Sequence, residues 1–143
     1  MARYAQRLIQ IRDGKILTDE LAADGRKGYV IPGGGSNPLG ALGYVACAQE
    51  ILGQAFQKGI QFDHVVCASG SGGTHSGMLV GMRAMGSRIP VTGISVRRPV
   101  PEQEGLIGGL AQQVREFLGL PAEPEEGELR IFDDYVGPGY SIP

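Results

Sequence analysis

One stretch, residues 64–77, constrains the fold more than any other part of the chain: it reads HVVCASGSGGTHSG. A β-branched apolar run ends at Ser69, small residues with three glycines follow, and apolar residues resume at helical spacing from Met78. This order predicts a strand, a glycine loop and the N-terminus of a helix. Glycines let the backbone come close to a bound group, and a first helical turn offers unpaired N–H groups to an anion. The sequence therefore predicts a phosphate-binding loop over residues 69–74.

The hydroxyl side chains of the loop favour this interpretation. Ser69, Ser71 and Thr74 can each donate a hydrogen bond to a phosphate oxygen. The alternative is a tight turn between strand and helix, in which Thr74 only caps the helix. The following residue, His75, is either a base beside the phosphate or a solvated or capping residue of the first helical turn.

Strands and helices are predicted to alternate along residues 28–143. The predicted strands are 29–31, 65–69, 90–96 and 129–132, and the predicted helices are about 38–57, 74–86 and 102–118. Such alternation is typical of a Rossmann-like, three-layer α/β/α fold with helices on both faces of a mostly parallel sheet of about four strands. Right-handed crossovers bring the carboxyl ends of all strands to one edge, where ligands bind.

Four segments are expected at that edge: residues 33–37, 69–74, 97–99 and 133–140. In the first of them, residues 34–36 either line the edge or cap the helix that begins at Pro38. Arg97 and Arg98 either help to hold an anion or are ordinary arginines at a strand end. Asp133 and Asp134 either orient a cationic group or form a turn.

The N-terminal segment, residues 1–27, is the least informative part of the chain. Apolar residues at helical spacing suggest one helix that the Asp-Gly pair at positions 13–14 ends, and residues 16–23 suggest a second short helix. We therefore predict an N-terminal helical segment, followed by one α/β domain over residues 28–143.

Composition narrows the possible partners. The 143 residues carry a net charge of −2 with interspersed charges, which argues against nucleic acid and against an anionic membrane. No apolar run approaches the roughly 18 residues of a membrane span. Cys47 and Cys67 fall in a predicted helix and strand, and we expect them to be reduced and buried, as in a cytoplasmic protein. The cysteines and histidines show no ligand spacing, so no metal site is predicted.

Three motifs in collinear order resemble one enzyme family. They are residues 29–45 (YVIPGGGSNPLGALGYV), 68–77 (ASGSGGTHSG) and 133–143 (DDYVGPGYSIP). Together they resemble the family of D-cysteine desulfhydrase and 1-aminocyclopropane-1-carboxylate (ACC) deaminase, within the fold type II, tryptophan-synthase-β-like enzymes that use pyridoxal phosphate. The resemblance covers about residues 28–143, roughly the middle of the family's chain, and is weak in residues 1–27.

The resemblance implies the fold of the large domain of those enzymes, an amino acid as substrate, and pyridoxal phosphate as cofactor. The cofactor-binding residues that it implies, at the phosphate, are Ser69, Ser71, Gly72, Gly73 and Thr74; a phosphate or sulfate anion would suit the same loop. It places Tyr140 near the substrate, where the hydroxyl would transfer a proton or hold the substrate. The alternative for this tyrosine is a half-buried loop aromatic.

Some parts of the family's pattern do not occur in this sequence. The family attaches its cofactor through a lysine in an N-terminal Gly-Asn-Lys motif, followed by a Ser-Asn-His/Gln motif, and a Thr-Gly-Gly run lies near its C-terminus. Here the three lysines, Lys15, Lys27 and Lys58, stand in no comparable context. Because the chemistry depends on that lysine, we expect a fragment or truncated homologue that is inactive alone.

Two other functions stay open at this point. One is a non-catalytic α/β module that binds a phosphorylated metabolite or a partner chain. The other is an NADP-binding Rossmann domain, since Gly70-Ser-Gly72 begins a dinucleotide fingerprint; however, His75 stands where the third glycine is required. We also expect a homo-oligomer, specifically a dimer, because a partial domain exposes apolar surface.

Overall fold

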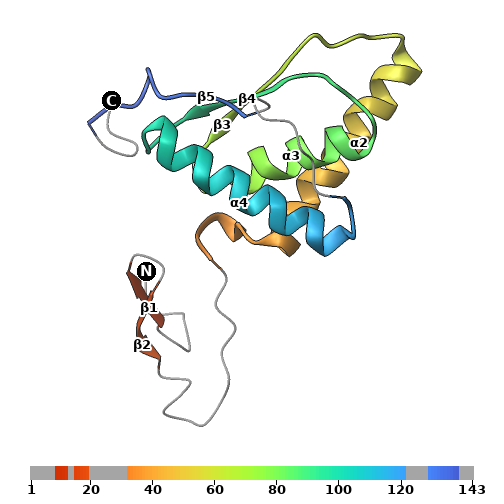
Figure 1. Ribbon diagram of the computed structural model, residues 1–143. Helices are drawn as coiled ribbons and strands as arrows, with labels where there is room; N and C mark the ends of the chain where they lie inside the picture. Colours follow the sequence, from red (N-terminus) through yellow and green to blue (C-terminus); the bar gives the residue numbers. More distant parts are fainter. Residues whose placement is uncertain (1–8, 13–14, 20–31, 122–128, 139–143) are drawn as a thin grey trace, which may run out of the picture. The chain divides into compact units, whose positions relative to one another are not determined.

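The computed structural model describes residues 9–12, 15–19, 32–121 and 129–138, and the chain divides into two compact units, residues 1–33 and 34–143 (Figure 1). In the first unit, β1 (Ile9–Arg12) and β2 (Lys15–Asp19) pair in antiparallel fashion.

The helices predicted for this N-terminal segment are therefore wrong at the residues that the structure describes. The signal that favours strands is present in the sequence. The run Ile-Gln-Ile-Arg of β1 alternates apolar and polar residues, and an Asp-Gly pair, a strong hairpin signal, follows it. Helices this short gain little from propensity alone, so the strand pairing prevails. The predicted domain boundary at residue 27 is not tested by these strands and stays a prediction.

The second unit carries the remaining helices and strands. Their order is η2 (Gly33–Gly35, at the junction), α2 (Pro38–Lys58), β3 (Val65–Ser69), α3 (Gly73–Ala84), β4 (Val91–Ser95), α4 (Val100–Leu118) and β5 (Arg130–Phe132). The strands β3, β4 and β5 form a parallel sheet in that order, with Ser69 beside Ser95 and Gly93 beside Ile131. The predicted α/β class with a parallel sheet is confirmed. The described sheet has three strands, and the other predicted strand, residues 29–31, lies outside the described residues.

The elements stack in three layers, with α3 at the centre (Figure 1). The sheet forms one layer, α3 and α4 pack against it, and α2 packs on α3 and α4. Nearly every residue of α3 from Gly73 to Met82 is buried. Close packing of α2 on α3 depends on small residues: a Cβ at Gly77 would lie 2.7 Å from Tyr44 Cβ, and one at Gly81 would lie 2.7 Å from Ala48 Cβ.

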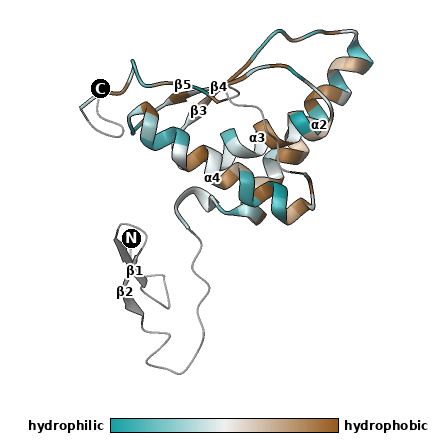
Figure 2. Cartoon of the chain, in the orientation of Figure 1, coloured by the Kyte–Doolittle hydropathy of each residue, from teal (hydrophilic) through white to brown (hydrophobic). Residues whose placement is uncertain are grey.

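The two faces of the sheet differ in their surroundings. Val65 and Val91 point to the helices and join a core cluster with Ala48, Met78, Leu79 and Met82. On the opposite face Val66 is 63% and Phe132 49% exposed. Within the described residues all three long helices therefore lie on one side of the sheet, whereas the sequence predicts helices on both faces. Figure 2 shows hydrophilic and hydrophobic residues interspersed along α4, and the buried apolar residues of this helix, Ile107, Leu110, Ala111 and Val114, recur at helical spacing.

Capping residues determine where α2 begins and ends. The side chain of Asn37 caps the helix by accepting a hydrogen bond from the Gly40 backbone N–H at 2.7 Å, and Pro38 follows as the first helical residue. Gly59 ends the helix in the left-handed region, with φ of 64°. None of the helices that the structure describes has the length and apolar character needed to cross a membrane.

Candidate functional site

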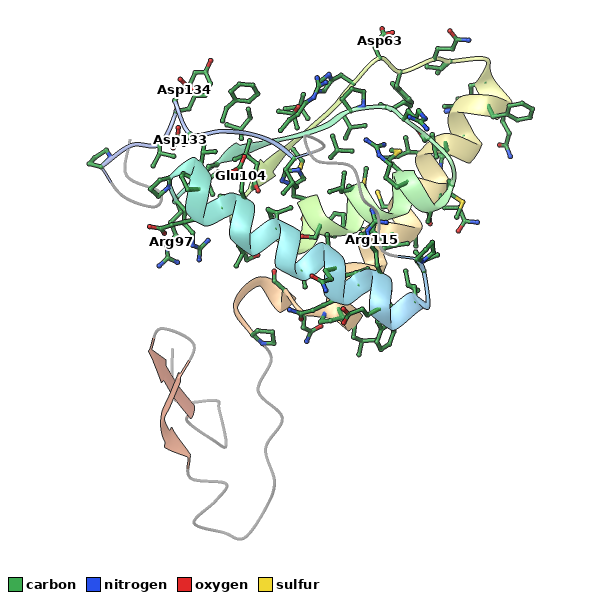
Figure 3. The ribbon with its side chains drawn as sticks, viewed as in Figure 1. Asp63, Arg97, Glu104, Arg115, Asp133 and Asp134 are labelled. Carbon is green, nitrogen blue, oxygen red and sulfur yellow. The ribbon has the colours of Figure 1, made fainter. Side chains whose placement is uncertain are left out.

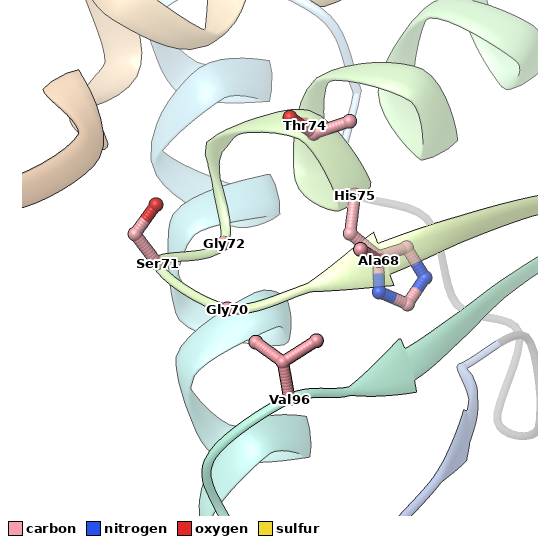
Figure 4. A pocket seen from close by; sticks show the side chains of 7 residues that line it. All are labelled: Ala68, Gly70, Ser71, Gly72, Thr74, His75 and Val96. Atoms are coloured by element: carbon pink, nitrogen blue, oxygen red, sulfur yellow. The ribbon is translucent and has the colours of Figure 1, made fainter. Parts of the chain in front are cut away.

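A pocket of about 490 Å³ opens at the carboxyl ends of β3 and β4, above the first turn of α3 (Figure 4). Its lining consists of Ala68, Gly70, Ser71, Gly72, Thr74, His75 and Val96. Of the predicted phosphate contacts, the structure thus brings Ser71, Gly72 and Thr74 to this pocket. Because ligands of open α/β sheets bind at this edge, the pocket is the candidate site.

The first turn of α3 faces the pocket without a side-chain cap. The cap residue is Gly72, which has φ of 98° and makes no capping side-chain bond, so Thr74 does not cap the helix. A Cβ at Gly72 would also lie 3.2 Å from Leu106 Cδ2, so both the backbone conformation and the space favour glycine. The first-turn N–H groups have no acceptor within their own helix, and they carry the positive end of its dipole. This end of α3 therefore suits an anion.

The segment before α2 lies directly against the loop. Ser36 Oγ donates a hydrogen bond to Ser71 Oγ at 2.8 Å and accepts one from the Gly73 backbone N–H at 3.1 Å. A Cβ at Gly34 would collide with the side chain of Ser71. Since Asn37 caps α2, Ser36 is left to contact the loop. Of the two roles predicted for residues 34–36, the structure supports lining the edge.

The back of the loop is a largely buried polar cluster of Ser69, His75, Arg98 and Gln103, of which only His75 also lines the pocket. Ser69 is 1% exposed and does not line the pocket. Its hydroxyl oxygen lies 3.1 Å from His75 Nδ1 and accepts a hydrogen bond from Gln103 Nε2 at 3.0 Å. The structure therefore places this predicted phosphate contact behind the loop, where it supports the backbone.

The Gly70 carbonyl is the second point at which this cluster holds the loop. It accepts hydrogen bonds from Gln103 Nε2 at 3.0 Å and from Arg98 Nη1 at 2.9 Å. The Arg98 guanidinium also donates to Gln103 Oε1 at 3.3 Å. Arg98 is thus a structural support of the loop, whereas its neighbour Arg97 is exposed.

His75 is fully buried, so the expectation of a solvated or capping residue is wrong. Its ring packs against Gly93, where a Cβ would collide with it, and in Figure 4 it points away from Ser71 and Thr74. Burial lowers the pKa of this imidazole, and a hydrogen-bonding backbone group of Val91 opposes part of that effect. Among the described residues its Nε2 has no partner that meets hydrogen-bond geometry. His75 is therefore a neutral part of the core near pH 7.

The two acidic residues after β5 have different surroundings: one is bonded within the protein and the other is exposed to solvent. Asp133 Oδ2 accepts a hydrogen bond from the Val100 backbone N–H at 2.8 Å, and Figure 3 shows this side chain beside the first turn of α4. Asp133 therefore satisfies a free N–H of that helix, in the position favourable for an acid. Asp134 is exposed, and Tyr140 lies outside the described residues.

Sequence reasoning missed one residue of this site, Gln103. Its signal is a polar residue in helical register with the apolar face of α4, formed by Ile107, Leu110 and Val114. A glutamine on a buried face needs partners for both ends of its amide. The structure shows them in Ser69, Gly70 and Arg98.

The donor set of the pocket fits a phosphate group. Hydroxyls at Ser71 and Thr74, a glycine-walled approach and the N-terminus of α3 supply several donors, and none of the lining residues in the described ranges carries a carboxylate. The described residues of the lining include no lysine or arginine. Such a site holds phosphate through backbone and hydroxyl donors rather than through an ion pair.

The family model described as "Pyridoxal-phosphate dependent enzyme" matches residues 1–143. A D-cysteine desulfhydrase of Yersinia enterocolitica is 39% identical over 127 residues, which are 89% of this chain and 38% of that protein. The D-cysteine desulfhydrase of Klebsiella pneumoniae is 43% identical over 129 residues, again 38% of its length. The crystal structure of an ACC deaminase homologue superposes with a TM-score of 0.67 and 39% identity, over 78% of this chain and 33% of that one.

These comparisons support the expected family and the partial coverage. The chain spans about two fifths of the length of the curated relatives that it matches. The match of the family model also includes residues 1–27, where the resemblance in the motifs is weak. Sequence and fold agree on the same assignment: the chain belongs to the family of pyridoxal-phosphate dependent enzymes.

Proposed function

We propose that this chain is the phosphate-binding part of an enzyme similar to D-cysteine desulfhydrase or ACC deaminase. In this proposal Ser71, Gly72 and Thr74 hold the phosphate of pyridoxal phosphate directly, Gly73 takes part through its N–H bond to Ser36 Oγ, and Ser69 supports the loop from behind. The observation that carries the proposal is that the first turn of α3 faces the pocket. Its cap residue, Gly72, has a left-handed backbone conformation and no side chain that could occupy the N–H groups. A phosphate placed there meets N–H groups and the positive end of the helix dipole.

The residues of this chain supply binding and orientation. Bound pyridoxal phosphate withdraws electrons from the α-carbon of an amino acid, which is the chemistry that this cofactor family uses. The loop fixes the phosphate end of the cofactor. The hydroxyls of Ser71 and Thr74 donate hydrogen bonds to the phosphate oxygens, and the hydrogen bond from Ser36 keeps Ser71 in place. Tyr140 near the substrate remains a proposal from the resemblance.

We propose that no lysine of this chain attaches the cofactor. Lys58 ends α2, while the loop contacts the segment before the other end of that helix. The 21 residues of α2 rise about 30 Å, which is far more than the length of a lysine side chain. Lys15 and Lys27 have no comparable sequence context. We therefore propose that the chain alone binds the cofactor through phosphate only and does not turn over D-cysteine.

The test combines binding with covalent trapping. The chain is titrated with pyridoxine 5′-phosphate, which lacks the aldehyde, and with pyridoxine as the control without phosphate. Binding of the first and not the second is expected. In parallel, pyridoxal phosphate adducts are trapped with borohydride and mapped, and sulfide and ammonia release from D-cysteine is measured. Stoichiometric trapping at one lysine together with turnover would overturn the proposed inactivity, whereas scattered partial labelling agrees with it.

A general phosphate-binding module is the second candidate, because the lining residues that the structure describes include no group that is specific for a pyridine ring. Glucose 6-phosphate and inorganic phosphate distinguish the two functions. Affinity equal to that of pyridoxine 5′-phosphate favours the module, and at least tenfold weaker binding favours the cofactor site.

The open face of the sheet supports the proposed homo-oligomer. Val66 and Phe132 lie on one face by strand register and are 63% and 49% exposed within the described residues. Burying such apolar area is favourable. Sedimentation at high micromolar concentration should therefore show a dimer, and a Val66→Thr, Phe132→Ser double variant should shift it to monomer. A clean monomer of the unmodified chain contradicts this proposal.

A further inference from the structure

The Gly70 carbonyl is held by two side chains that the proposed phosphate contacts do not include. Gln103 Nε2 and Arg98 Nη1 donate to it at 3.0 and 2.9 Å, and neither residue lines the pocket. Gln103 is fully buried and Arg98 is half-buried. A carbonyl that accepts two hydrogen bonds has both lone pairs occupied, so its direction is fixed.

The direction of this carbonyl determines the direction of the next N–H group. The Gly70–Ser71 peptide bond is planar, and the structure has no cis peptide bonds among its described residues. In a trans peptide the C=O and the following N–H point to opposite sides. Because the Gly70 carbonyl points to Gln103 and Arg98, the Ser71 N–H points away from them, and Ser71 itself lines the pocket.

We propose that Gln103 and Arg98 are positioning residues, a peptide clamp that keeps the Ser71 N–H directed at the bound anion. The inference rests on the proposed phosphate site and names the residues that make its loop selective for an anion. Without the clamp the peptide can turn over, and the Gly70 carbonyl oxygen then faces the pocket. A carbonyl oxygen carries partial negative charge, so this orientation repels a phosphate.

Glycine at position 70 makes such a clamp necessary. A Cβ at this position would lie 3.1 Å from Val96 Cγ2, which is tighter than ordinary contact, so a side chain is disfavoured. Without a side chain, however, the residue reaches backbone conformations closed to other residues. The conformation of the loop must then be selected by partners from elsewhere in the chain.

The clamp residues are themselves held in place. The Ser95 hydroxyl donates to the Arg98 carbonyl at 2.6 Å and accepts from its N–H at 3.1 Å, which fixes the turn after β4. Gln103 sits in the first turn of α4, where Asp133 holds the Val100 N–H at 2.8 Å. One short segment, residues 95–103, thus supplies both side chains that hold a peptide group about thirty residues earlier in the chain.

The experiment uses amide NMR of the whole chain, with Gln103→Leu as the main variant and Gln112→Leu as its matched control. Gln112 lies on the same helix, is exposed, and bonds to Glu116. Without ligand, Gln103→Leu should split or broaden the amide signals of residues 70–72, while Gln112→Leu leaves them unchanged. With inorganic phosphate, the Ser71 amide signal should move downfield in the unmodified chain, and Gln103→Leu should weaken phosphate binding at least tenfold.

The variant Arg98→Lys tests whether the clamp depends on the charge of Arg98 or on the geometry of its guanidinium group, because lysine keeps the positive charge and lacks that geometry. Broadened signals at residues 70–72 and about threefold weaker phosphate binding are expected. This half-buried position also provides the test if Gln103→Leu does not fold. Pyridoxine 5′-phosphate should rank the variants in the same order as inorganic phosphate.

The outcomes separate the clamp from the phosphate site. If Gln103→Leu and Arg98→Lys keep sharp, unshifted signals at residues 70–72, the clamp is wrong, whatever the ligand does. If phosphate binding is normal in these variants while the signals do broaden, the clamp does not serve the anion and the inference is also overturned. If the unmodified chain binds no phosphate, the proposed function fails and takes with it the anion role of the clamp.

Discussion

Ser69 and Ser71 are two residues apart and carry the same hydroxyl group, but one is buried behind the loop and the other faces the pocket. Ser71 is exposed at the pocket and bonded to Ser36, whereas Ser69 is 1% exposed and bonded to Gln103 and His75. The glycine loop thus has a ligand side, with donors available to an anion, and a support side, on which polar groups are paired inside the protein. In the proposed function, ligand binding depends on the first side, and folding stability depends on the second.

The difference follows from which helix lies on each side. On the ligand side the N-terminus of α3 leaves backbone N–H groups without helical acceptors. On the support side the first turn of α4 covers the loop and brings Gln103 against it. A buried polar group without a partner costs about 1–3 kcal/mol, so the support side must pair its polar groups, while the ligand side is open to solvent.

The largest effect should come from filling the support side. A Cβ at Gly93 would collide with the His75 ring and lie 2.8 Å from Ser69 Cβ, and both neighbours are buried. Gly93→Ala should therefore lower the free energy of unfolding by about 3 kcal/mol, at the upper end of overpacking effects. Urea unfolding measures it.

Gly109→Ala is the matched control, because nothing lies within 4 Å of a Cβ at this exposed helical position. It should raise the stability by about 0.5–1 kcal/mol. Equal effects of the two substitutions would show that the support side is not tightly packed.

The second prediction compares alanine substitutions at the two serines, Ser69 and Ser71. Ser69→Ala removes the partner of Gln103 Nε2 and His75 Nδ1 and should cost about 1–2 kcal/mol of unfolding free energy. Ser71→Ala should cost less than about 0.5 kcal/mol, as expected for exposed positions, but should weaken binding of pyridoxine 5′-phosphate several-fold. Thermal unfolding and ligand titration on both variants provide the comparison. A reversed pattern would contradict the assignment of the two sides.

The smallest effect concerns the pH dependence of stability. Burial lowers the pKa of His75 in the folded chain below the ordinary value of 6.5, so the unfolded chain binds the proton more readily. The stability contribution of the neutral ring is complete above pH 6.5 and is lost as the pH falls toward the folded-state pKa. Urea unfolding from pH 7.5 downward should show this decline, and His75→Gln should flatten it. A parallel decline in the variant would assign the effect to other groups.

Much of this molecule could be predicted from local sequence patterns. The order of strand, loop and helix follows from hydrophobic periodicity and glycine, and the ends of α2 follow from Asn37, Pro38 and Gly59. These features depend on neighbours within a few residues, so the sequence carries them directly. The N-terminal hairpin is the exception, since short apolar runs fit helix and strand alike.

Only the tertiary structure decided which side of the loop each group serves. Nothing in the local sequence separates Ser69 from Ser71, or shows that His75 is fully buried while Ser71 is exposed. The partners that distinguish them, Ser36 and Gln103, lie more than thirty residues away in the chain. Periodicity determines which face of an element is apolar, but the pairing of individual polar groups depends on how the elements pack, and that is settled only when the core is formed.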